Sequence, residues 1–344
     1  MKVLVVNNAA PFIRGGAEEL ADHLVRKLNA TDGVQAELLR VPFAWAPRER
    51  LIDEIVLNQA FQLYNVDRVI GLKFPAYLIP HQDKVLWLLH QFRQAYDLDI
   101  AGQSHLGDDP DGRAIRNAIQ AADDQCFADC RRIFVNSPTT QGRLKKFNGF
   151  SSEVLYPPLN DEELFVPGEY GNYIFAGGRV APGKRQHLLI EAMAKAKGDF
   201  RLVIAGPPES DAYAVELTAL VERLDLKDRV ELKFGFHPRE DIARWAAGAL
   251  ACAYLPFDED SVGYVTMEAF ACAKAMLTVS DSGGLLEIVS ERTGAVVAPT
   301  AEAVAEGMAR LSEPSRARGL GEAAKTLWDE KGVTWDETIR RLLA

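Results

Sequence analysis

The sequence is poor in cysteine and lacks long apolar runs. Only four of its 344 residues are cysteines, and their spacing is not that of a disulfide scaffold, which favours a reducing compartment. Cys126 and Cys130 lie four apart on a predicted helix, but no second Cys or His pair completes a metal site, so two buried helix positions are the simpler interpretation. The run 246–257 is too short to cross a bilayer, and Met1–Asn7 is too short for a signal-peptide core. A cytoplasmic protein is therefore expected.

Positive charge is also in deficit, with 39 Lys and Arg against 49 Asp and Glu and a net charge of −10. Binding nucleic acid requires an extended basic face, so no nucleic-acid partner is expected, although a local basic pocket for one diphosphate is compatible with this balance. The basic segment with Arg143, Lys145 and Lys146 leaves open a peripheral contact with the inner face of a membrane. A solvated helix face is the simpler interpretation of it.

What the chain does contain is an alternation of short apolar segments with helical patterns. In the first half, strands are predicted at 2–6, 68–71, 85–89 and 132–135, and helices at 17–28 and from 137 towards 147. In the second half, strands are predicted at 173–176, 201–205, 230–234, 250–255, 275–279 and 295–297, and helices at 186–196, 212–224, 239–247, 265–273, 285–289 and 301–311. Such alternation predicts α/β domains with parallel sheets.

A segment rich in proline and acidic residues, 156–168, interrupts the alternation and reads as an inter-domain linker. We therefore expect an N-terminal domain over 1–160, a C-terminal domain over 161–325, and a terminal helix within 326–344 that packs back on the first domain. In open α/β sheets, ligands bind beyond the carboxyl ends of the strands, so functional residues should directly follow strands.

Two features of the first domain occupy such places. Gly15 and Gly16 come too late after the first strand for a dinucleotide-binding fingerprint, but they precede a helix whose N-terminal amides could receive an anion. A ligand-free tight turn explains the glycine pair equally well. His90 ends a buried strand and could donate to a sugar hydroxyl or a developing negative charge, while a structural histidine is the alternative.

The second domain offers a basic loop after its first strand. Gly178 permits close backbone approach, and Arg179 and Lys184 could together neutralise a diphosphate leaving group without a metal. The loop lacks the Gly-x-x-x-x-Gly-Lys-Ser/Thr pattern of a P-loop. A solvated basic turn is the alternative interpretation.

An acidic loop and a helix N-terminus follow the strand at 250–255. The helix amides of Tyr264, Val265 and Thr266 are expected to face a ligand, and Glu268, placed in the first helical turn, could accept both vicinal hydroxyls of a ribose. Asp260 lies in the loop and could reach another part of that ligand. The alternative is helix-end charge stabilisation by Glu268 and an ordinary polar loop.

Three motifs together resemble glycosyltransferase family 4: Gly-Gly-Arg-x4-Lys at 177–184, an acidic residue followed by glutamate at 260 and 268, and Ser-Gly-Gly-x-x-Glu at 282–287. This is a retaining, nucleotide-sugar-dependent family with the GT-B fold, and the similarity extends from the 15–16 loop to the final helix. The resemblance implies two facing doubly wound, Rossmann-like parallel-sheet domains with an inter-domain cleft. The first would be the acceptor side and the second the donor-binding side.

The resemblance also implies residue roles. Arg179 and Lys184 would hold the donor diphosphate, Glu268 the ribose, and Asp260 the transferred hexose, with His90 near that hexose. The implied catalytic set is His90, Asp260, Arg179 and Lys184, and the implied donor-binding set is Gly16, Gly178, Arg179, Lys184, Phe236, Gly263, Tyr264, Val265, Thr266 and Glu268. The family usually has glutamate where Asp260 stands, and a glutamate side chain is longer by about 1.5 Å. Glu259 is an alternative residue that could supply this carboxylate.

The expected activity is retaining transfer of a hexose from a nucleotide-diphosphate sugar to a glycan or lipid-linked acceptor, with no metal or other cofactor. Three alternatives stay open: a non-catalytic sugar-nucleotide-binding protein, a GT-B phosphorylase, and an NAD-dependent oxidoreductase. The missing glycine fingerprint argues against the last of these.

Overall fold

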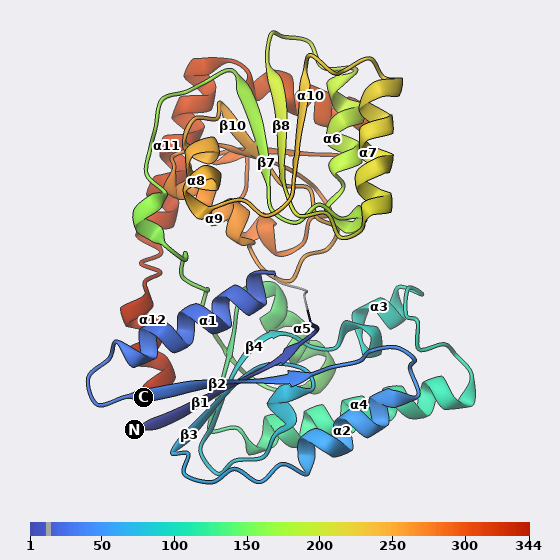
Figure 1. Cartoon of the computed structure of the whole chain (residues 1–344), viewed down its shortest axis with the longest axis vertical. Helices are drawn as coiled ribbons and strands as arrows, with labels where there is room; N and C mark the ends of the chain where they lie inside the picture. The colour runs from blue at the N-terminus through green and yellow to red at the C-terminus, as the bar shows by residue number, and fades with distance from the viewer. Residues whose placement is uncertain (12–14) are drawn as a thin grey trace. The chain divides into compact units, whose positions relative to one another are not determined.

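The computed structural model describes residues 1–11 and 15–344. The chain forms two compact units, one of Met1–Asn160 with Thr334–Ala344 and the other of Asp161–Val333. Each unit contains a six-stranded sheet whose paired strands run parallel, with helices on both faces (Figure 1). The α/β class and the doubly wound sheets predicted above are confirmed.

In the first unit the strand order is β2-β1-β3-β4-β5-β6. The strands are β1 (Lys2–Ala9), β2 (Gln35–Pro42), β3 (Arg68–Lys73), β4 (Lys84–His90), β5 (Arg132–Val135) and β6 (Glu153–Val154). The helices are α1 (Gly16–Asn29), α2 (Arg50–Gln59), α3 (Asp97–Ile100), α4 (Pro110–Asp129), α5 (Pro138–Asn148) and α12 (Trp335–Leu343), with 3₁₀ helices η1 (Ala76–Leu78) and η2 (Arg93–Ala95). Helices α1 and α12 cover one face of this sheet, and α2 and α4 cover the other (Figure 1).

In the second unit the strand order is β12-β11-β10-β7-β8-β9. The strands are β7 (Tyr173–Gly177), β8 (Arg201–Gly206), β9 (Val230–Phe234), β10 (Ala251–Ala253), β11 (Met276–Val279) and β12 (Gly294–Val297). The helices are α6 (Gln186–Met193), α7 (Asp211–Arg223), α8 (Arg239–Ala247), α9 (Tyr264–Ala271), α10 (Ala301–Leu311) and α11 (Pro314–Glu330), with 3₁₀ helices η3 (Glu162–Leu164), η4 (Pro182–Lys184) and η5 (Gly284–Glu287). Both sheets therefore present the carboxyl ends of several parallel strands at one edge.

Local sequence explains how individual elements begin and end. Helix α5 starts where the Ser137 hydroxyl accepts the Thr140 amide at 3.0 Å, with Pro138 at the first helical position. It ends at Gly149, whose φ of 76° is left-handed and favours glycine. The helix predicted from 137 towards 147 is confirmed.

The C-terminal helix α12 belongs to the first unit. The Trp335 indole donates to the Leu159 carbonyl at 3.2 Å, and Ile339 and Leu342 are buried in the same core as α1. Each such burial stabilises by about 1.5–3 kcal/mol. The second domain was expected to end at 325; α11 continues to Glu330, and the chain returns to the first unit at Thr334.

Two local predictions need correction. Residues 285–289 were expected to form a helix, but only the short 3₁₀ helix η5 forms after Gly283, which has a φ of 74°. A Cβ on Gly284 would lie 2.7 Å from the Asp260 carbonyl oxygen, so a backbone packed this closely leaves little space for a regular turn. Cys130 was expected on a helix, but it lies just beyond α4 as its C-cap residue.

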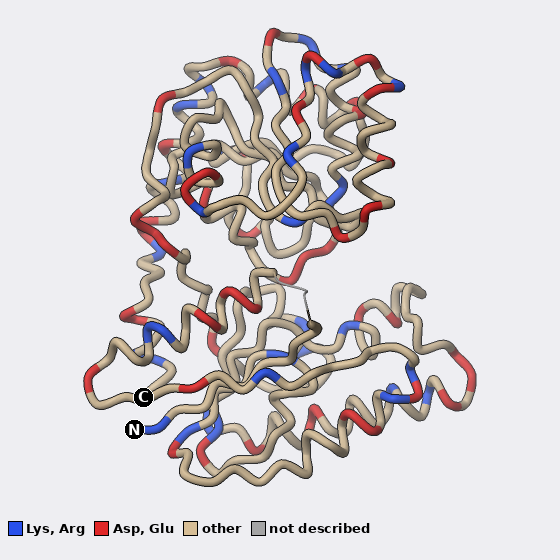
Figure 2. The backbone as a smooth tube through the Cα atoms, in the orientation of Figure 1, with Lys and Arg blue, Asp and Glu red and all other residues tan. Residues whose placement is uncertain are grey.

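Acidic and basic residues are interspersed over both units (Figure 2). The three cations of the basic segment contact neighbours within the first unit. Arg143 lies 3.6 Å from Asp97, Lys145 donates to a carbonyl at the end of its own helix at 2.9 Å, and Lys146 lies 5.0 Å from the centroid of Phe147. In the described part of the chain, no helix has the length and apolar character needed to cross a bilayer.

A buried carboxyl in the first unit makes stability depend on pH. The Tyr77 and Tyr96 hydroxyls each donate to fully buried Asp123 at 2.8 Å. Burial raises the pKa of Asp123 from 3.8 to about 7, against the lowering effect of the two hydroxyls. The folded protein therefore retains a proton that the unfolded chain releases, and this contribution to stability is lost as pH rises towards 7.

Relative to Asp123→Asn, we expect the wild type to lose more than about 1 kcal/mol of unfolding free energy between roughly pH 5 and pH 8. Urea unfolding of both proteins across this range measures the difference. Parallel pH profiles would show that Asp123 does not titrate differently in the folded and unfolded states.

Candidate functional site

In the second unit, the loops at the carboxyl ends of β7, β10 and β11 are joined by backbone hydrogen bonds. The Phe257 amide donates to the Gly183 carbonyl at 2.9 Å, and the Asp258 amide donates to the Asp281 carbonyl at 2.8 Å. These bonds bring the basic loop 178–185 and the acidic loop 257–263 together, although about 75 residues separate them in sequence.

Glycines permit close backbone approach at this edge. Gly206 ends β8 with a φ of 149°, and a Cβ there would lie 1.9 Å from the Gly178 carbonyl oxygen. Gly178 itself has a φ of 98°, and its Cβ would lie 3.0 Å from Val265 Cγ2 at the start of α9. The loop after β7 is therefore packed against both β8 and α9 with no space for side chains at these points.

Lys184 is largely buried and neutralised within the protein. Its ammonium group forms an ion pair with Glu259 and lies 5.2 Å from the centroid of the Tyr254 ring. Burial opposes the charged form, but Tyr254 and Glu259 outweigh it and hold the pKa of Lys184 above its usual range. Glu259 and Tyr254 were not predicted as partners of Lys184; Tyr254 lay within the predicted strand 250–255, and in the structure it directly follows β10.

Arg179 is held differently. Its side chain is 43% exposed and lies 3.9 Å from Glu209, which is 51% exposed. Such an exposed pair contributes little and leaves the guanidinium mobile enough to change partners. The basic loop therefore carries the largely buried Lys184, the accessible Arg179, and Arg185, whose guanidinium pairs with Asp281 at 2.8 Å.

The N-terminus of α9 begins at Gly263, whose φ is 75° and whose Cβ would lie 2.8 Å from Tyr254 Cε1. Tyr264 and Val265 are the first two helical residues, and amides in these positions have no intrahelical acceptor. The Thr266 amide instead donates to the Gly263 carbonyl at 3.1 Å. An anion at the start of α9 would lie at the positive end of the helix.

Glu268 was expected in the first turn of α9, but it lies just beyond that turn. It is the fifth residue of the helix, because α9 starts at Tyr264, and its side chain is 7% exposed. Arg239 Nη1, at the start of α8, lies 2.7 Å from Glu268 Oε1. Asp260 is also buried, and its main chain packs against Gly284.

Phe236, a member of the predicted donor-binding set, follows β9. Phe236 is 73% exposed. The adjacent His237 packs edge-on against Trp245, with centroids 5.0 Å apart, and its Nε2 lies 2.9 Å from the Lys233 carbonyl. The exposed ring of Phe236 can stack on a planar ligand.

In the first unit, His90 is the last residue of β4 and is partly buried. Its Nδ1 lies 2.7 Å from the Gln91 carbonyl. The side-chain amide of Gln91 donates to Asn148 Oδ1, and the side-chain amide of Asn148 donates to the Tyr96 hydroxyl at 3.2 Å. The strand end that carries His90 is therefore supported by a hydrogen-bond network that continues to buried Asp123.

The predicted anion site at α1 is occupied by a side chain of the helix itself. Gly16 is the first residue of α1, and the Gly15 amide donates to Glu18 Oε2 at 2.9 Å. Residues 12–14 of the preceding loop lie outside the described residues. An anion would compete with the Glu18 carboxylate for this amide.

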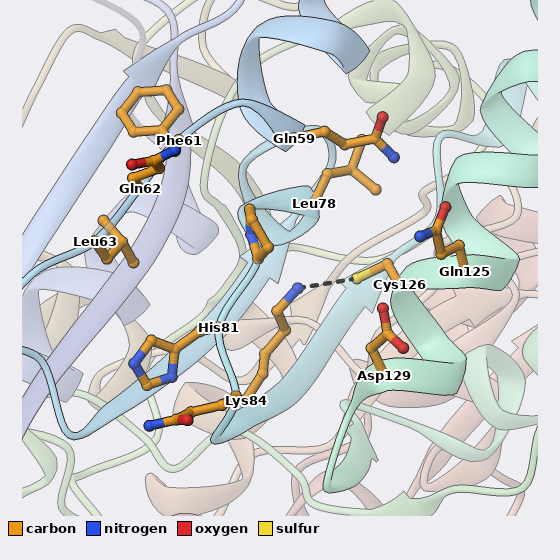
Figure 3. Close-up of a pocket in the computed structure, with 12 residues that line it drawn as sticks. Gln59, Phe61, Gln62, Leu63, Leu78, His81, Lys84, Gln125, Cys126 and Asp129 are labelled. Atoms are coloured by element: carbon orange, nitrogen blue, oxygen red, sulfur yellow. Dashed lines mark hydrogen bonds between the residues drawn. The ribbon is translucent and has the colours of Figure 1, made fainter.

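A cavity of about 730 Å³ opens at the amino end of β4, opposite to the edge expected to bind ligands (Figure 3). Buried Lys84 donates to the Tyr77 carbonyl at 3.1 Å and to Cys126 Sγ at 3.5 Å. The cavity is lined by Gln59, Phe61, Gln62, Leu63, Leu78, Pro80, His81, Gln82, Lys84, Gln125, Cys126 and Asp129. None of the predicted site residues is among them.

Within residues 1–11 and 15–344, no three His, Cys, Asp or Glu side chains are grouped so that they could hold a metal ion. The loop cluster in the second unit holds three cations, Arg179, Lys184 and Arg185, and lies beside the N-terminus of α9.

Comparison with known proteins places these features in context. Residues 161–327 match the family model of glycosyl transferases group 1. The D-inositol 3-phosphate glycosyltransferase of Segniliparus rotundus is 25% identical over 240 residues, which cover 64% of this chain and 53% of the relative. The chain spans about half the length of the curated relatives it matches.

Two solved structures cover nearly the whole chain. Sucrose-phosphate synthase from Thermosynechococcus elongatus has a TM-score of 0.76 at 18% identity, covering 99% of this chain and 97% of its own. Anabaena HepE in complex with UDP-glucose has a TM-score of 0.72 at 16% identity, covering 100% of this chain and 98% of its own. The similarity confirms the predicted GT-B fold of two Rossmann-like domains.

Proposed function

We propose that the chain is a glycosyltransferase that uses a nucleotide-diphosphate sugar. The match of residues 161–327 to the family model of glycosyl transferases group 1 supports this proposal. The observation that carries this proposal is the loop cluster in that domain. There the basic loop with Lys184 packs against the N-terminus of α9 at the carboxyl edge of one sheet, and the buried carboxylate of Glu268 lies one turn further along the same helix. Cations and backbone amides bind the phosphates of a nucleotide diphosphate, and a carboxylate can accept hydrogen bonds from its two ribose hydroxyls.

Arg179 and Lys184 hold the diphosphate in this proposal. Lys184 exchanges its pairing with Glu259 for the phosphate oxygens, and exposed Arg179 moves from Glu209 to the same anion. Negative charge on the diphosphate grows as the glycosidic bond breaks, so these cations stabilise the transition state more than the bound donor. No metal is required for this neutralisation.

The remaining residues recognise the sugar and the nucleoside. Glu268 accepts the ribose hydroxyls, Phe236 lies beside the base, and Asp260 contacts the transferred hexose, to which His90 donates. The acceptor, a glycan or lipid-linked glycan, attacks the anomeric carbon from the face that the diphosphate leaves. Its hydroxyl proton passes to the departing phosphate, and configuration is retained.

Binding of a nucleoside diphosphate tests this proposal directly, with UDP, ADP and GDP as probes. UDP is included because HepE has been solved with UDP-glucose bound. One probe should raise the melting temperature, with a stabilisation of about 2.7 kcal/mol at a hundred times its dissociation constant, in EDTA as in magnesium. Hydrolysis of the corresponding sugar donors should likewise survive EDTA. A response to none of the three would contradict the nucleotide site, and activity lost in EDTA but restored by magnesium or manganese would contradict the metal-free mechanism.

A further inference from the structure

Glu268 reaches its place through a set of contacts that links three segments of the second unit. The guanidinium of Arg239, the first residue of α8, donates to Glu268 Oε1 at 2.7 Å. The same guanidinium lies 4.7 Å from the centroid of Phe165, which is 3% exposed and directly follows η3. Asp161 Oδ2 lies 3.8 Å from Arg239 Nε. Besides the Glu268 carboxylate, the guanidinium therefore contacts an aromatic ring and a second acidic residue.

This arrangement constrains the carboxylate more than burial alone would. A glutamate side chain has three rotatable bonds, and ordering it costs up to about 2 kcal/mol of conformational free energy. A planar guanidinium held on an aromatic ring presents its N–H groups in a fixed direction, so the accepted hydrogen bond fixes the plane of the carboxylate as well. Because Arg239 engages Oε1, the second oxygen, Oε2, is directed by the same contact.

We infer that Arg239 is a positioning residue that orients Glu268 for the ribose hydroxyls of the nucleotide and thereby sets the preference for ribose over 2′-deoxyribose. The inference rests on the proposed function, in which Glu268 accepts those hydroxyls. Arg239 acts through Glu268 and need not contact the nucleotide itself. Phe165 and Asp161 support it from the segment that enters the second unit.

The inference predicts an effect confined to recognition of the sugar hydroxyls. Removing the guanidinium leaves Glu268 buried and able to accept a hydrogen bond, but in several orientations. Binding of a ribonucleoside diphosphate then loses the advantage of a pre-oriented acceptor, while its 2′-deoxy analogue, which offers one hydroxyl fewer, loses less. Diphosphate binding by Lys184 should be unaffected.

Isothermal titration with UDP and 2′-deoxy-UDP tests the inference, or with the ADP or GDP pair if that diphosphate binds most tightly. The wild type should prefer the ribonucleotide, and Arg239→Met should reduce this preference about five- to tenfold. Arg239→Lys, which keeps the charge but not the planar group, should restore part of it. Arg244→Met is the matched control, because Arg244 lies on the same helix, 67% exposed, and pairs only locally with Asp241 at 2.7 Å.

The double variant Arg239→Met/Glu268→Gln separates positioning from a general loosening of the unit. If Arg239 acts through Glu268, the double variant should have the ribose preference of Glu268→Gln alone. The inference is overturned if Glu268→Gln loses the ribose preference but Arg239→Met keeps it. It is also overturned if Arg239→Met weakens binding of both nucleotides equally. If the wild type shows no preference, or Glu268→Gln leaves it unchanged, the assignment of Glu268 to the ribose fails first, and the inference about Arg239 fails with it.

Discussion

Lys184→Ala should weaken binding of the nucleoside diphosphate by about ten- to a hundredfold, with little effect on the bare nucleoside, because a charge-assisted hydrogen bond contributes roughly 1.5–3 kcal/mol. Turnover should fall further than affinity, since the charge that Lys184 stabilises is greatest in the transition state. The partner of Lys184 enlarges the effect, because removing Lys184 leaves the partly exposed Glu259 carboxylate beside the phosphates. Arg179→Ala should act in the same direction but less strongly, since Arg179 is 43% exposed.

Dissociation constants for nucleoside, nucleoside diphosphate and sugar donor, measured on each variant, test this expectation. The double variant Lys184→Ala/Glu259→Gln is the control, because it removes the negative charge of Glu259 together with the positive charge of Lys184. This double variant should bind the diphosphate better than Lys184→Ala alone. If Arg179 and Lys184 variants bind the diphosphate as tightly as the wild type, the donor site lies elsewhere.

His90→Ala should lower kcat by about a hundred- to a thousandfold while the dissociation constant of the nucleoside diphosphate changes less than about threefold. The reason is the position of His90 at the end of β4, because the family resemblance implies that this residue lies near the transferred sugar rather than the nucleotide. His90→Gln, which keeps a donor of similar length, should recover part of the rate. Calorimetry with the diphosphate and a transfer assay separate the two quantities, and a large loss of affinity with an unchanged rate would contradict the assigned role.

Much of the fold was predictable because it depends on local patterns. The strands Arg132–Val135 and Val230–Phe234 and the helices Arg239–Ala247 and Ala301–Leu311 have the predicted limits, since each combines a clear apolar periodicity with a polar boundary. Strand β2 (Gln35–Pro42) was missed, because only Ala36 and Val41 in it are buried. Its apolar residues, Ala36, Leu38, Leu39 and Val41, do not alternate strictly with polar ones, so the sequence lacks a clear strand period, and the pairing with β1 emerges only from the folded structure.

The site was predictable in its parts but not in its pairings. Glycines and charged residues after strands identified the loops, because the carboxyl ends of parallel strands meet at one edge. The pairing of Lys184 with Glu259 joins residues 75 positions apart, and that of Arg239 with Glu268 joins residues 29 apart. No spacing rule connects such residues, so these ion pairs, and the role inferred for Arg239, emerge only from the folded structure.

The return of the chain to its first unit has a consequence for the order in which the protein is made. Residues 161–333 are contiguous and can fold as soon as they leave the ribosome, whereas the first unit also requires Thr334–Ala344. Until these residues are synthesised, the surface of the first unit that receives Trp335, Ile339 and Leu342 stays exposed to water. The unit whose synthesis begins first is therefore the last to be completed, and during that interval its open apolar surface is a natural target for a chaperone.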